Sequence, residues 1–378
     1  MRWRLCSKAC NYTKGEEICV KEKTILLLAS YYGPYGGNFV ASLLAFNNSI
    51  KEQGGKIIYI FPKDVEGYSW VPQVRSVADK VYFIPYKPYS RDNIERIKKI
   101  VQDEKTDIVF SRMGGWDITA CLAAGKIPVI WLLEYALVVN GIKKRLKYLV
   151  KYRLIGRNVI NLAVSDASAK QVNLYNPKHE CQSIPNALDL SRLCTKSEMR
   201  NTDGICNILI FAYDPWIKGL DIALDAVEKL NTEKLKYRLL ISAQERTHYY
   251  LKERYSEIPE WIQVLQPTND ISSVYAQADI MLSASRHEGF SYCLAEAIYT
   301  GLPVIYSDIP GTSWADAFKA CYQFKSGDVD SLVDAIECCS SLRITKIDFE
   351  ENRKLMTQKY SMDTWCEHVL EAVNVALE

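Results

Sequence analysis

Short apolar segments alternate with helical segments along most of the chain, and this alternation constrains the fold more than any other feature. In the first half the strand-like segments are TILLLAS (24–30), KIIYIF (56–61), KVYFIPY (80–86), DIVFSR (107–112), PVIWLLE (128–134), LAVS (162–165) and CQSIP (181–185). Strands that are apolar on both faces and separated by helices are typical of a parallel sheet covered on both sides. The alternation therefore predicts an α/β fold built on parallel sheets.

The alternation restarts after a polar stretch at 189–205, which we interpret as an interdomain linker. The later strand-like segments are NILIFAY (207–213), YRLLIS (237–242), IQVLQ (262–266), DIMLSAS (279–285) and PVIYSD (303–308). A chain of 378 residues has room for two domains of this kind. The sequence thus predicts an extension (1–22), an N-terminal domain (23–188), the linker, a C-terminal domain (206–345) and C-terminal helices (346–378), the last of which returns to the N-terminal domain.

Composition narrows the class of protein. The chain is 48% hydrophobic with a formal net charge of +2, which disfavours a disordered chain and gives no support for nucleic-acid binding. Its twelve cysteines form no C-x-x-C pair, as expected of a reduced, cytoplasmic protein. No secretory leader or run of eighteen apolar residues occurs in the sequence. We therefore expect a cytoplasmic protein without a membrane-spanning segment.

The segment SRHEGFSYCLAEAIYTG (285–301) is the most informative for chemistry. A strand ends at Ser285, a loop carries Glu288 and Gly289, and a helix is predicted from about Ser291. The free N–H groups and partial positive charge of a helix N-terminus suit an anionic ligand. Glu296 lies further along the predicted helix, and the two carboxylates together are able to accept hydrogen bonds from the hydroxyl groups of one ligand. A solvated pair of glutamates is the ordinary alternative for this spacing.

Two further turns follow strands. Lys218 and Gly219 stand where a strand passes into a helix, a place from which a lysine reaches a phosphate as a point charge. Gly36 and Gly37 precede the first helix, and paired glycines allow close approach of the backbone to a ligand. The sequence fits neither the dinucleotide fingerprint nor the P-loop. A surface lysine before a helix is the alternative for Lys218.

Together these segments carry a family resemblance. SASRHEGFSYCLAEAIYTGLPVIYSD (283–308) resembles the E-x7-E region of retaining GT-B glycosyltransferases of family four, and the Lys218–Gly219 turn matches as well. GGNFVASLLAFNNSIKEQ (36–53) is similar to the N-terminal glycine loop and helix of that family. The resemblance spans about 24–376 and is specific in the C-terminal half and looser in the N-terminal half. It implies a GT-B fold, in which two Rossmann-like parallel-sheet domains face each other across a cleft.

The resemblance implies that the C-terminal domain holds a nucleotide-sugar donor and the N-terminal domain faces the acceptor. Glu288 and Lys218 would be the catalytic residues. The donor-binding residues would be Gly36, Gly37, Lys218, Glu288, Gly289, Phe290, Ser291 and Glu296. Lys218, Gly36 and Gly37 would contact the diphosphate. Glu288 and the backbone of 289–291 would hold the sugar, and Glu296 would bind the ribose. The expected transfer is a retaining one without metal or cofactor. The Asp-x-Asp at Asp328 and Asp330 is interpreted as a helix cap.

The sequence departs from the family pattern at three positions. Tyr213 stands where the family usually has an arginine, so that a second cation would have to come from elsewhere, with Arg286 and Arg112 as candidates. Glu134 stands where a histidine is common, and none of the four histidines precedes His179. Trp314 replaces a glutamate. On the acceptor side we single out Arg112, Trp116 and Glu134, although core packing is the commoner role for a tryptophan.

The segment GIKKRLKYLVKYRLIGR (141–157) contains seven basic residues and no acidic one. An amphipathic basic helix suits an anionic membrane surface, and an ordinary domain helix with a solvated face is the alternative. If 142–157 binds such a surface, the acceptor is expected to be a lipid-linked sugar and the protein to lie at the inner membrane face. A glycan acceptor in surface polysaccharide synthesis fits the resemblance equally. Two other functions remain open, namely an inactive GT-B relative that binds nucleotide sugar or glycan, and a nucleotide-sugar epimerase.

Overall fold

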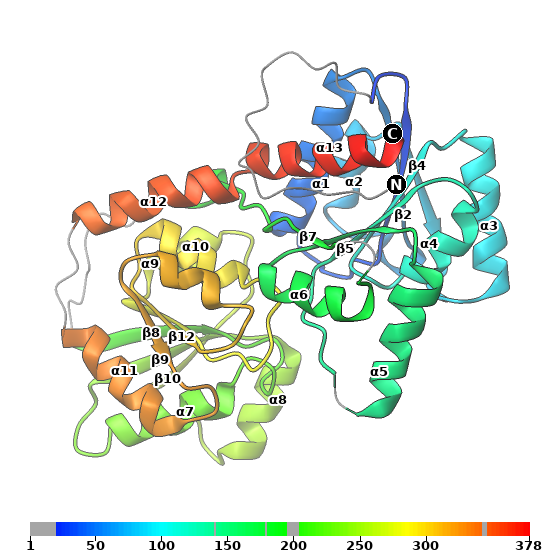
Figure 1. Cartoon of the computed structure of the whole chain (residues 1–378). Coiled ribbons are helices and arrows are strands. Elements are labelled where there is room, and N and C mark those ends of the chain that lie inside the picture. Colours follow the sequence, from blue (N-terminus) through cyan, green and yellow to red (C-terminus); the bar gives the residue numbers. More distant parts are fainter. Residues whose placement is uncertain (1–19, 140, 178–179, 195–203, 342–345) are drawn as a thin grey trace.

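The structure is a computed structural model, and it describes residues 20–139, 141–177, 180–194, 204–341 and 346–378. The predicted extension (1–22) and linker (189–205) therefore lie partly outside the described residues. Figure 1 shows two α/β bodies, which the last two helices span.

The N-terminal domain is built on a seven-stranded sheet with the order β3-β2-β1-β4-β5-β6-β7. Its strands are β1 (Thr24–Ala29), β2 (Lys56–Pro62), β3 (Lys80–Ile84), β4 (Ile108–Arg112), β5 (Val129–Leu133), β6 (Ile160–Ala163) and β7 (Gln182–Ser183). All neighbouring strands pair in parallel. The order reverses between β1 and β4, and this switch point is where open parallel sheets bind ligands.

The C-terminal domain repeats this topology with six strands in the order β10-β9-β8-β11-β12-β13. Its strands are β8 (Cys206–Phe211), β9 (Tyr237–Ser242), β10 (Ile262–Leu265), β11 (Ile280–Ser283), β12 (Val304–Ser307) and β13 (Cys321–Phe324), again all parallel. The second switch point lies between β8 and β11. These two all-parallel sheets confirm the predicted α/β fold class with two parallel-sheet domains.

Helices cover both sheets. In the N-terminal domain these are α1 (Gly37–Glu52), α2 (Val71–Val77), α3 (Arg91–Asp103), α4 (Asp117–Ala124), α5 (Ile142–Tyr148) and α6 (Asp166–Tyr175), with short turns η1 (Lys63–Val65) and η3 (Leu190–Arg192) and a π-helical turn η2 (Leu149–Ile155). In the C-terminal part they are α7 (Leu220–Leu230), α8 (Glu245–Arg254), α9 (Ile271–Ala276), α10 (Tyr292–Thr300), η4 (Ser313–Ala317), α11 (Val329–Ser341), α12 (Lys346–Tyr360) and α13 (Met362–Leu377).

Side-chain caps define where several helices begin. The hydroxyl groups of Ser90, Ser165 and Ser361 each accept a hydrogen bond from a backbone N–H of the first helical turn, as serine commonly does. The cap at Ser361 fixes the start of α13 at Met362. No helix in the part of the chain that the structure describes is long and apolar enough to span a bilayer.

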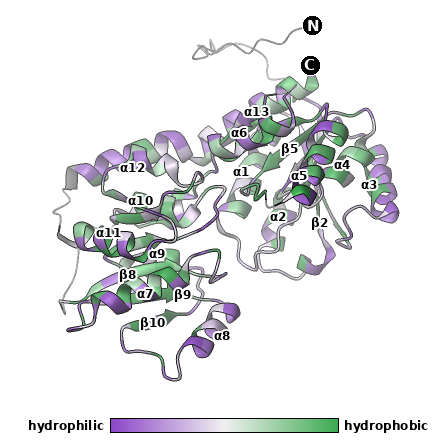
Figure 2. Ribbon diagram, turned by 60° about the horizontal axis from the view of Figure 1, so that its bottom comes forward, coloured by the Kyte–Doolittle hydropathy of each residue, from purple (hydrophilic) through white to green (hydrophobic). Residues whose placement is uncertain are grey.

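The apolar strands form the centre of each domain. Leu26, Leu27 and Leu28 of β1 are each 0% exposed, and burial of one such side chain contributes about 1.5–3 kcal/mol. Figure 2 shows the strands of both sheets in hydrophobic colours beneath helices that carry both colours. The continuous apolar runs in the sequence are therefore explained by burial of both sheet faces.

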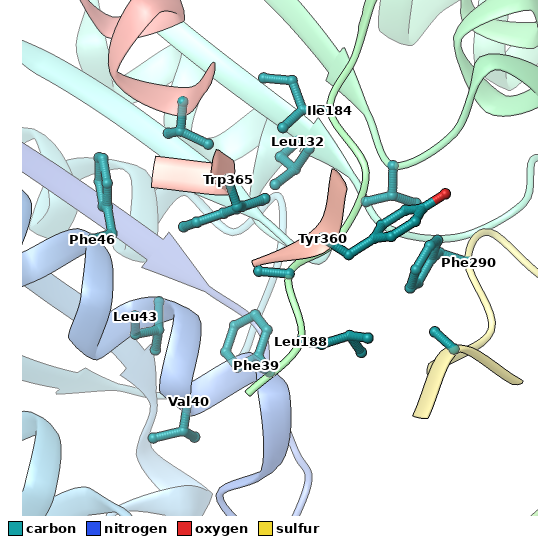
Figure 3. Packing of buried hydrophobic residues seen from close by; sticks show 14 of the residues in the cluster. Phe39, Val40, Leu43, Phe46, Leu132, Ile184, Leu188, Phe290, Tyr360 and Trp365 are labelled. Carbon is teal, nitrogen blue, oxygen red and sulfur yellow. The ribbon is translucent and has the colours of Figure 1, made fainter. Parts of the chain in front are cut away.

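The last two helices connect the domains. α12 packs against α10 of the C-terminal domain, while α13 packs against α1, β4 and β5 of the N-terminal domain. Figure 3 shows Trp365 of α13 beside Phe46 of α1, and Tyr360 beside Phe290 of the C-terminal domain. The same buried cluster thus includes side chains from both domains, which pack against each other through it.

Candidate active site

The loops that follow the switch-point strands carry the predicted site residues. Gly36 and Gly37 follow β1, Lys218 follows β8 and Glu288 follows β11. Because parallel strands end at a common edge, loops after neighbouring strands meet there. The two domains present these edges to each other, so residues far apart in the sequence lie together.

Lys218 and Glu288 form a buried ion pair. The Lys218 Nζ lies 2.5 Å from Glu288 Oε1, and the two side chains are 9% and 10% exposed. Ser285 Oγ donates to the same carboxylate oxygen at 2.8 Å. Burial alone would lower the pKa of Lys218, but the Glu288 carboxylate outweighs it and raises that pKa. Lys218 is therefore a fixed positive charge at the carboxyl end of β8, as the predicted diphosphate contact requires.

Glu296 lies where the domains meet. Its Oε1 accepts a hydrogen bond from Asn38 Nδ2 of the N-terminal domain at 2.7 Å, and its Oε2 accepts one from the Tyr275 hydroxyl at 2.6 Å. Burial raises the pKa of Glu296, and hydrogen bonds from Tyr275 and Asn38 together with the charge of Arg192 offset part of that rise. The carboxylate is thus buried, and each of its oxygens accepts a hydrogen bond from a neighbouring side chain.

Gly37 begins α1 with a positive φ of 52°, a conformation that glycine adopts without strain. An added Cβ there would lie 3.8 Å from a guanidinium nitrogen of Arg192. Because Asn38 follows directly, the glycine loop, Arg192 and Glu296 share one neighbourhood. The sequence did not identify Arg192, since the polar linker that contains it has no motif; the signal was only its place at the interdomain connection.

The turn at Gly289 and the start of α10 close the site from the C-terminal side. An added Cβ on Gly289 would lie 2.8 Å from Tyr135 Cα and 2.9 Å from the Glu134 carbonyl oxygen. The Phe290 ring is buried and stacks on Trp314 with centroids 4.9 Å apart, so that it offers the site only its backbone. Ser291 is the N-cap residue of α10 and makes no side-chain cap, which leaves first-turn N–H groups for an anionic ligand.

Glu134 forms an ion pair with an arginine of its own domain. Arg112 Nη2 donates to Glu134 Oε1 at 2.6 Å, and the Met113 N–H donates to Oε2 at 3.1 Å. Arg112 is fully buried and lies over the rings of Phe39 and Trp365. The glutamate at the position of the family's histidine is therefore charge-compensated, and Arg112 is committed to it. Arg112 lies in the core, which goes against the expectation that it supplies a cation to the diphosphate or contacts the acceptor.

Trp116 also lies in the core. It is 0% exposed and packs edge-on against Tyr86. Because no part of its ring is exposed, the structure goes against the expectation that Trp116 stacks on an acceptor sugar. Sequence alone did not separate the two roles, because a tryptophan before a helix fits both.

The position of the family's arginine is filled differently. Tyr213 is 49% exposed, and the Lys218 Nζ lies 4.8 Å from the centroid of its ring. Arg286 forms two hydrogen bonds to Asp221, of 2.9 and 2.7 Å, and is therefore held on α7. Arg192 is the cation that interacts with Glu296 in this arrangement.

A cavity of about 210 Å³ lies between the domains next to Glu288. Its walls are the loop 136–139, residues 167, 168 and 171 of α6, the segment 286–288 and the turn 309–311. Both domains therefore contribute to a pocket that opens beside the Lys218–Glu288 pair. The Asp-x-Asp does not take part: Asp328 accepts a hydrogen bond from the Ser331 N–H, as predicted for a helix cap, and Asp330 pairs with Lys229.

Comparison with known proteins agrees with this geometry. Residues 207–341 match the family described as Glycosyl transferases group 1. The GtfA subunit of a UDP-N-acetylglucosamine–peptide N-acetylglucosaminyltransferase from Streptococcus pneumoniae serotype 4 is 32% identical over 94 residues. The matched stretch makes up 24% of this chain and spans only 18% of the length of that relative.

Solved structures resemble nearly the whole chain. A glycosyltransferase from Rickettsia africae ESF-5 covers 94% of this chain and 99% of its own, with a TM-score of 0.75 and 18% identity. Anabaena Alr3699/HepE in complex with UDP-glucose covers 93% of this chain and 99% of its own, with a TM-score of 0.75 and 16% identity. These comparisons support the predicted family and confirm the GT-B fold, since the solved structures match 93–94% of this chain and residues 207–341 carry the sequence pattern of glycosyl transferases group 1.

Proposed function

We propose that the protein is a glycosyltransferase that moves a sugar from a nucleotide-sugar donor to a glycan or lipid-linked acceptor in the cytoplasm. The observation that carries the proposal is the hydrogen bond between Asn38 and Glu296, residues 258 positions apart. It brings the glycine loop of one domain onto the C-terminal domain that also carries Lys218 and Glu288. A binding site assembled from both domains is what a donor lying across a cleft requires.

The donor is proposed to bind with its diphosphate toward Lys218, Arg192 and the N-terminus of α10. Each supplies positive charge or N–H groups where negative charge collects on the leaving diphosphate. Glu296 would accept the ribose hydroxyls in exchange for Asn38 and Tyr275. We take UDP as the nucleotide to test first, because it is the nucleotide in the Anabaena structure.

The chemistry proposed is a retaining transfer without metal. The bond between the anomeric carbon and the diphosphate oxygen breaks, and the acceptor hydroxyl oxygen bonds to that carbon on the same face, while its proton passes to the departing phosphate. A carboxylate has about four acceptor positions. Lys218 and Ser285 use positions on Glu288, and the remaining ones would hold sugar hydroxyls.

Turnover of donors tests this function. The purified chain is incubated with UDP-, GDP- and ADP-sugars, with and without EDTA, while release of nucleoside diphosphate is followed and the first-formed sugar anomer is identified by NMR. We expect release from one donor class, unaffected by EDTA and with retained configuration. Glu288→Gln should slow release about 100-fold or more, in the range found for loss of one electrostatic contact to a transition state.

Glu337→Gln, at an exposed position of α11 in the same domain, is the matched control and should leave the rate unchanged. Binding of a donor without any turnover would identify an inactive relative instead. Inversion of configuration, or full activity of Glu288→Gln, would contradict the proposed mechanism.

A further inference from the structure

The segment formed by α5 and η2 exposes an apolar ridge. Ile142, Leu146, Val150 and Leu154 are 85%, 60%, 36% and 66% exposed. They recur at every fourth position, so that they lie on one side of the helix. Ordinary helices of a folded domain turn such a stripe toward the core. The ridge therefore faces solvent where a helix of this pattern would normally be packed.

Exposed cations flank the ridge. They are Lys143, Lys144, Arg145, Lys147, Arg153 and Arg157, and no acidic residue occurs between 141 and 157. Leu174 of the neighbouring helix α6 is a further exposed apolar side chain, at 79%. Tyr175 of α6 packs against Tyr148 of α5, which places the two helices side by side. Apolar side chains and positive charge thus share one surface.

Lys151 anchors the α5–η2 segment to the domain through a buried ion pair. It does not join the exposed basic face that the sequence suggested, because its Nζ lies 2.5 Å from Asp117 of α4 and its side chain is 5% exposed. Although burial opposes it, the Asp117 carboxylate raises the pKa of Lys151 well above its ordinary value, so Lys151 stays charged. Tyr152 is buried against Trp131 of β5. The side of the segment opposite the ridge is therefore fixed in the core.

The surface also lies next to the candidate active site. Lys151 interacts with Tyr135, which begins the loop whose residues 136–139 line the interdomain cavity. That loop is held in turn by α6, since Gln171 Oε1 accepts a hydrogen bond from the Leu137 N–H. The element that carries the ridge is thus in contact, through its buried side, with the loop that forms the cavity wall.

We propose that the ridge and its six flanking cations form a docking surface for an anionic membrane, with the apolar side chains in the boundary between headgroups and acyl chains. The charges decide the occupant: a segment with six exposed cations and no acidic residue between 141 and 157 is complementary to anionic lipid, whereas the same segment of a second copy would repel it. The inference goes beyond the proposed function, because docking requires neither donor nor acceptor. It would deliver a lipid-linked acceptor to the cavity.

Vesicle flotation with the full-length chain tests the proposal. Vesicles of phosphatidylcholine alone are compared with vesicles in which about a third of the lipid is phosphatidylglycerol. Both are tested at low and at high salt. We expect binding to the anionic vesicles that weakens as salt increases. Lys143→Gln/Lys144→Gln/Lys147→Gln should weaken it about 100-fold, at about fivefold for each basic residue near the surface. Arg91→Gln/Arg96→Gln/Lys98→Gln, which removes three exposed charges from α3, should not.

The ridge is tested separately from the charges. Leu146→Ser should weaken vesicle binding about tenfold, whereas Val375→Ser, at a similarly exposed position of α13, should leave it unchanged. All of these positions are exposed, so thermal melting should show no loss of fold. Absence of wild-type binding to anionic vesicles would overturn the proposal. Binding of the charge and ridge variants that equals that of wild type would overturn it as well. Self-association that Leu146→Ser abolishes, without vesicle binding, would assign the ridge to a second copy and overturn it as well.

Discussion

At the scale of single residues, the candidate site depends on charges that are paired before any ligand arrives. Lys218 is paired with Glu288, and Glu296 is held by Asn38 and Tyr275. Each of these groups would otherwise pay a large desolvation cost in a buried place. A ligand with a diphosphate and vicinal hydroxyls, as proposed above, would therefore have to replace these existing partners. Affinity for such a ligand should respond to the protonation of Glu296.

Donor affinity is predicted to fall as the pH is lowered toward the pKa of Glu296. Burial raises that pKa, so the loss should begin above the usual range for a glutamate. The sign follows from the chemistry, because the ionised carboxylate accepts two hydroxyl hydrogens and the protonated one accepts less well. Calorimetric titration of UDP from about pH 8 down to about pH 5, a range that lies above the ordinary pKa of a glutamate, measures the change in affinity. Glu296→Gln should bind about tenfold more weakly and lose this pH dependence; an unchanged profile would contradict the assignment.

Arg192 is predicted to contribute to binding of the diphosphate. Arg192→Gln should weaken UDP binding about tenfold, a typical loss for a hydrogen bond to a charged group, and leave uridine binding nearly unchanged. Arg75→Gln, an exposed arginine on α2 paired with Glu66, is the control. Equal affinity of wild type and Arg192→Gln for UDP would show that the cation missing at Tyr213 is not replaced by Arg192.

At the scale of elements, the π-helical turn η2 shows what the sequence pattern did not contain. The run 141–155 predicts one helix, and the structure divides it at Leu149. The division coincides with the buried Lys151, whose partner Asp117 lies 34 residues earlier in the chain. A local periodicity cannot report such a tertiary contact. The caps and strands were predictable because their signals lie within a few residues, as for Ser361.

The ion pair at η2 is predicted to be essential for the element. Lys151→Met leaves Asp117 buried without its counter-charge, which should lower the free energy of unfolding by about 3–5 kcal/mol. Lys147→Met, four residues earlier and exposed, should change it by less than about 0.5 kcal/mol. Urea denaturation measures both. The double variant Lys151→Met/Asp117→Asn should recover part of the loss, and equal stability of the two lysine variants would refute the anchoring role.

At the scale of the whole molecule, the architecture of each domain was largely predictable from the sequence, whereas the contacts between the domains were not. Alternating strands and helices predicted two parallel-sheet domains, and the switch points then place Lys218 and Glu288 at one edge. The burial of Trp116 and Arg112 depends on tertiary packing around the N-terminal sheet, and the Asn38–Glu296 contact depends on how the domains meet. No local sequence pattern records either. Gly289 is the clearest case, because its neighbours are the backbone of Glu134 and Tyr135 in the other domain.

Gly289→Ala is predicted to open the contact between the domains. The added Cβ would lie within 3.0 Å of backbone atoms that cannot rotate away, so the turn and the loop must separate. UDP affinity should fall about tenfold or more, and the Tm should decrease by several degrees, as expected for a loss of about 1 kcal/mol or more. Gly67→Ala, where nothing lies within 4 Å of the added Cβ, should match wild type. Wild-type affinity in Gly289→Ala would show that the domains do not close on the nucleotide.

Calorimetric titration of UDP-sugars into wild type, Lys218→Met and Lys229→Met tests the central claim most directly. The account predicts one binding site in wild type and in Lys229→Met, whose substituted lysine is exposed and distant in the domain. It predicts affinity at least about 10-fold weaker in Lys218→Met, through loss of a charge-assisted contact to the diphosphate. Folding of both variants is checked by circular dichroism. Absence of binding of any nucleotide sugar to wild type, or equal affinity in folded Lys218→Met, would contradict a donor site between the two domains.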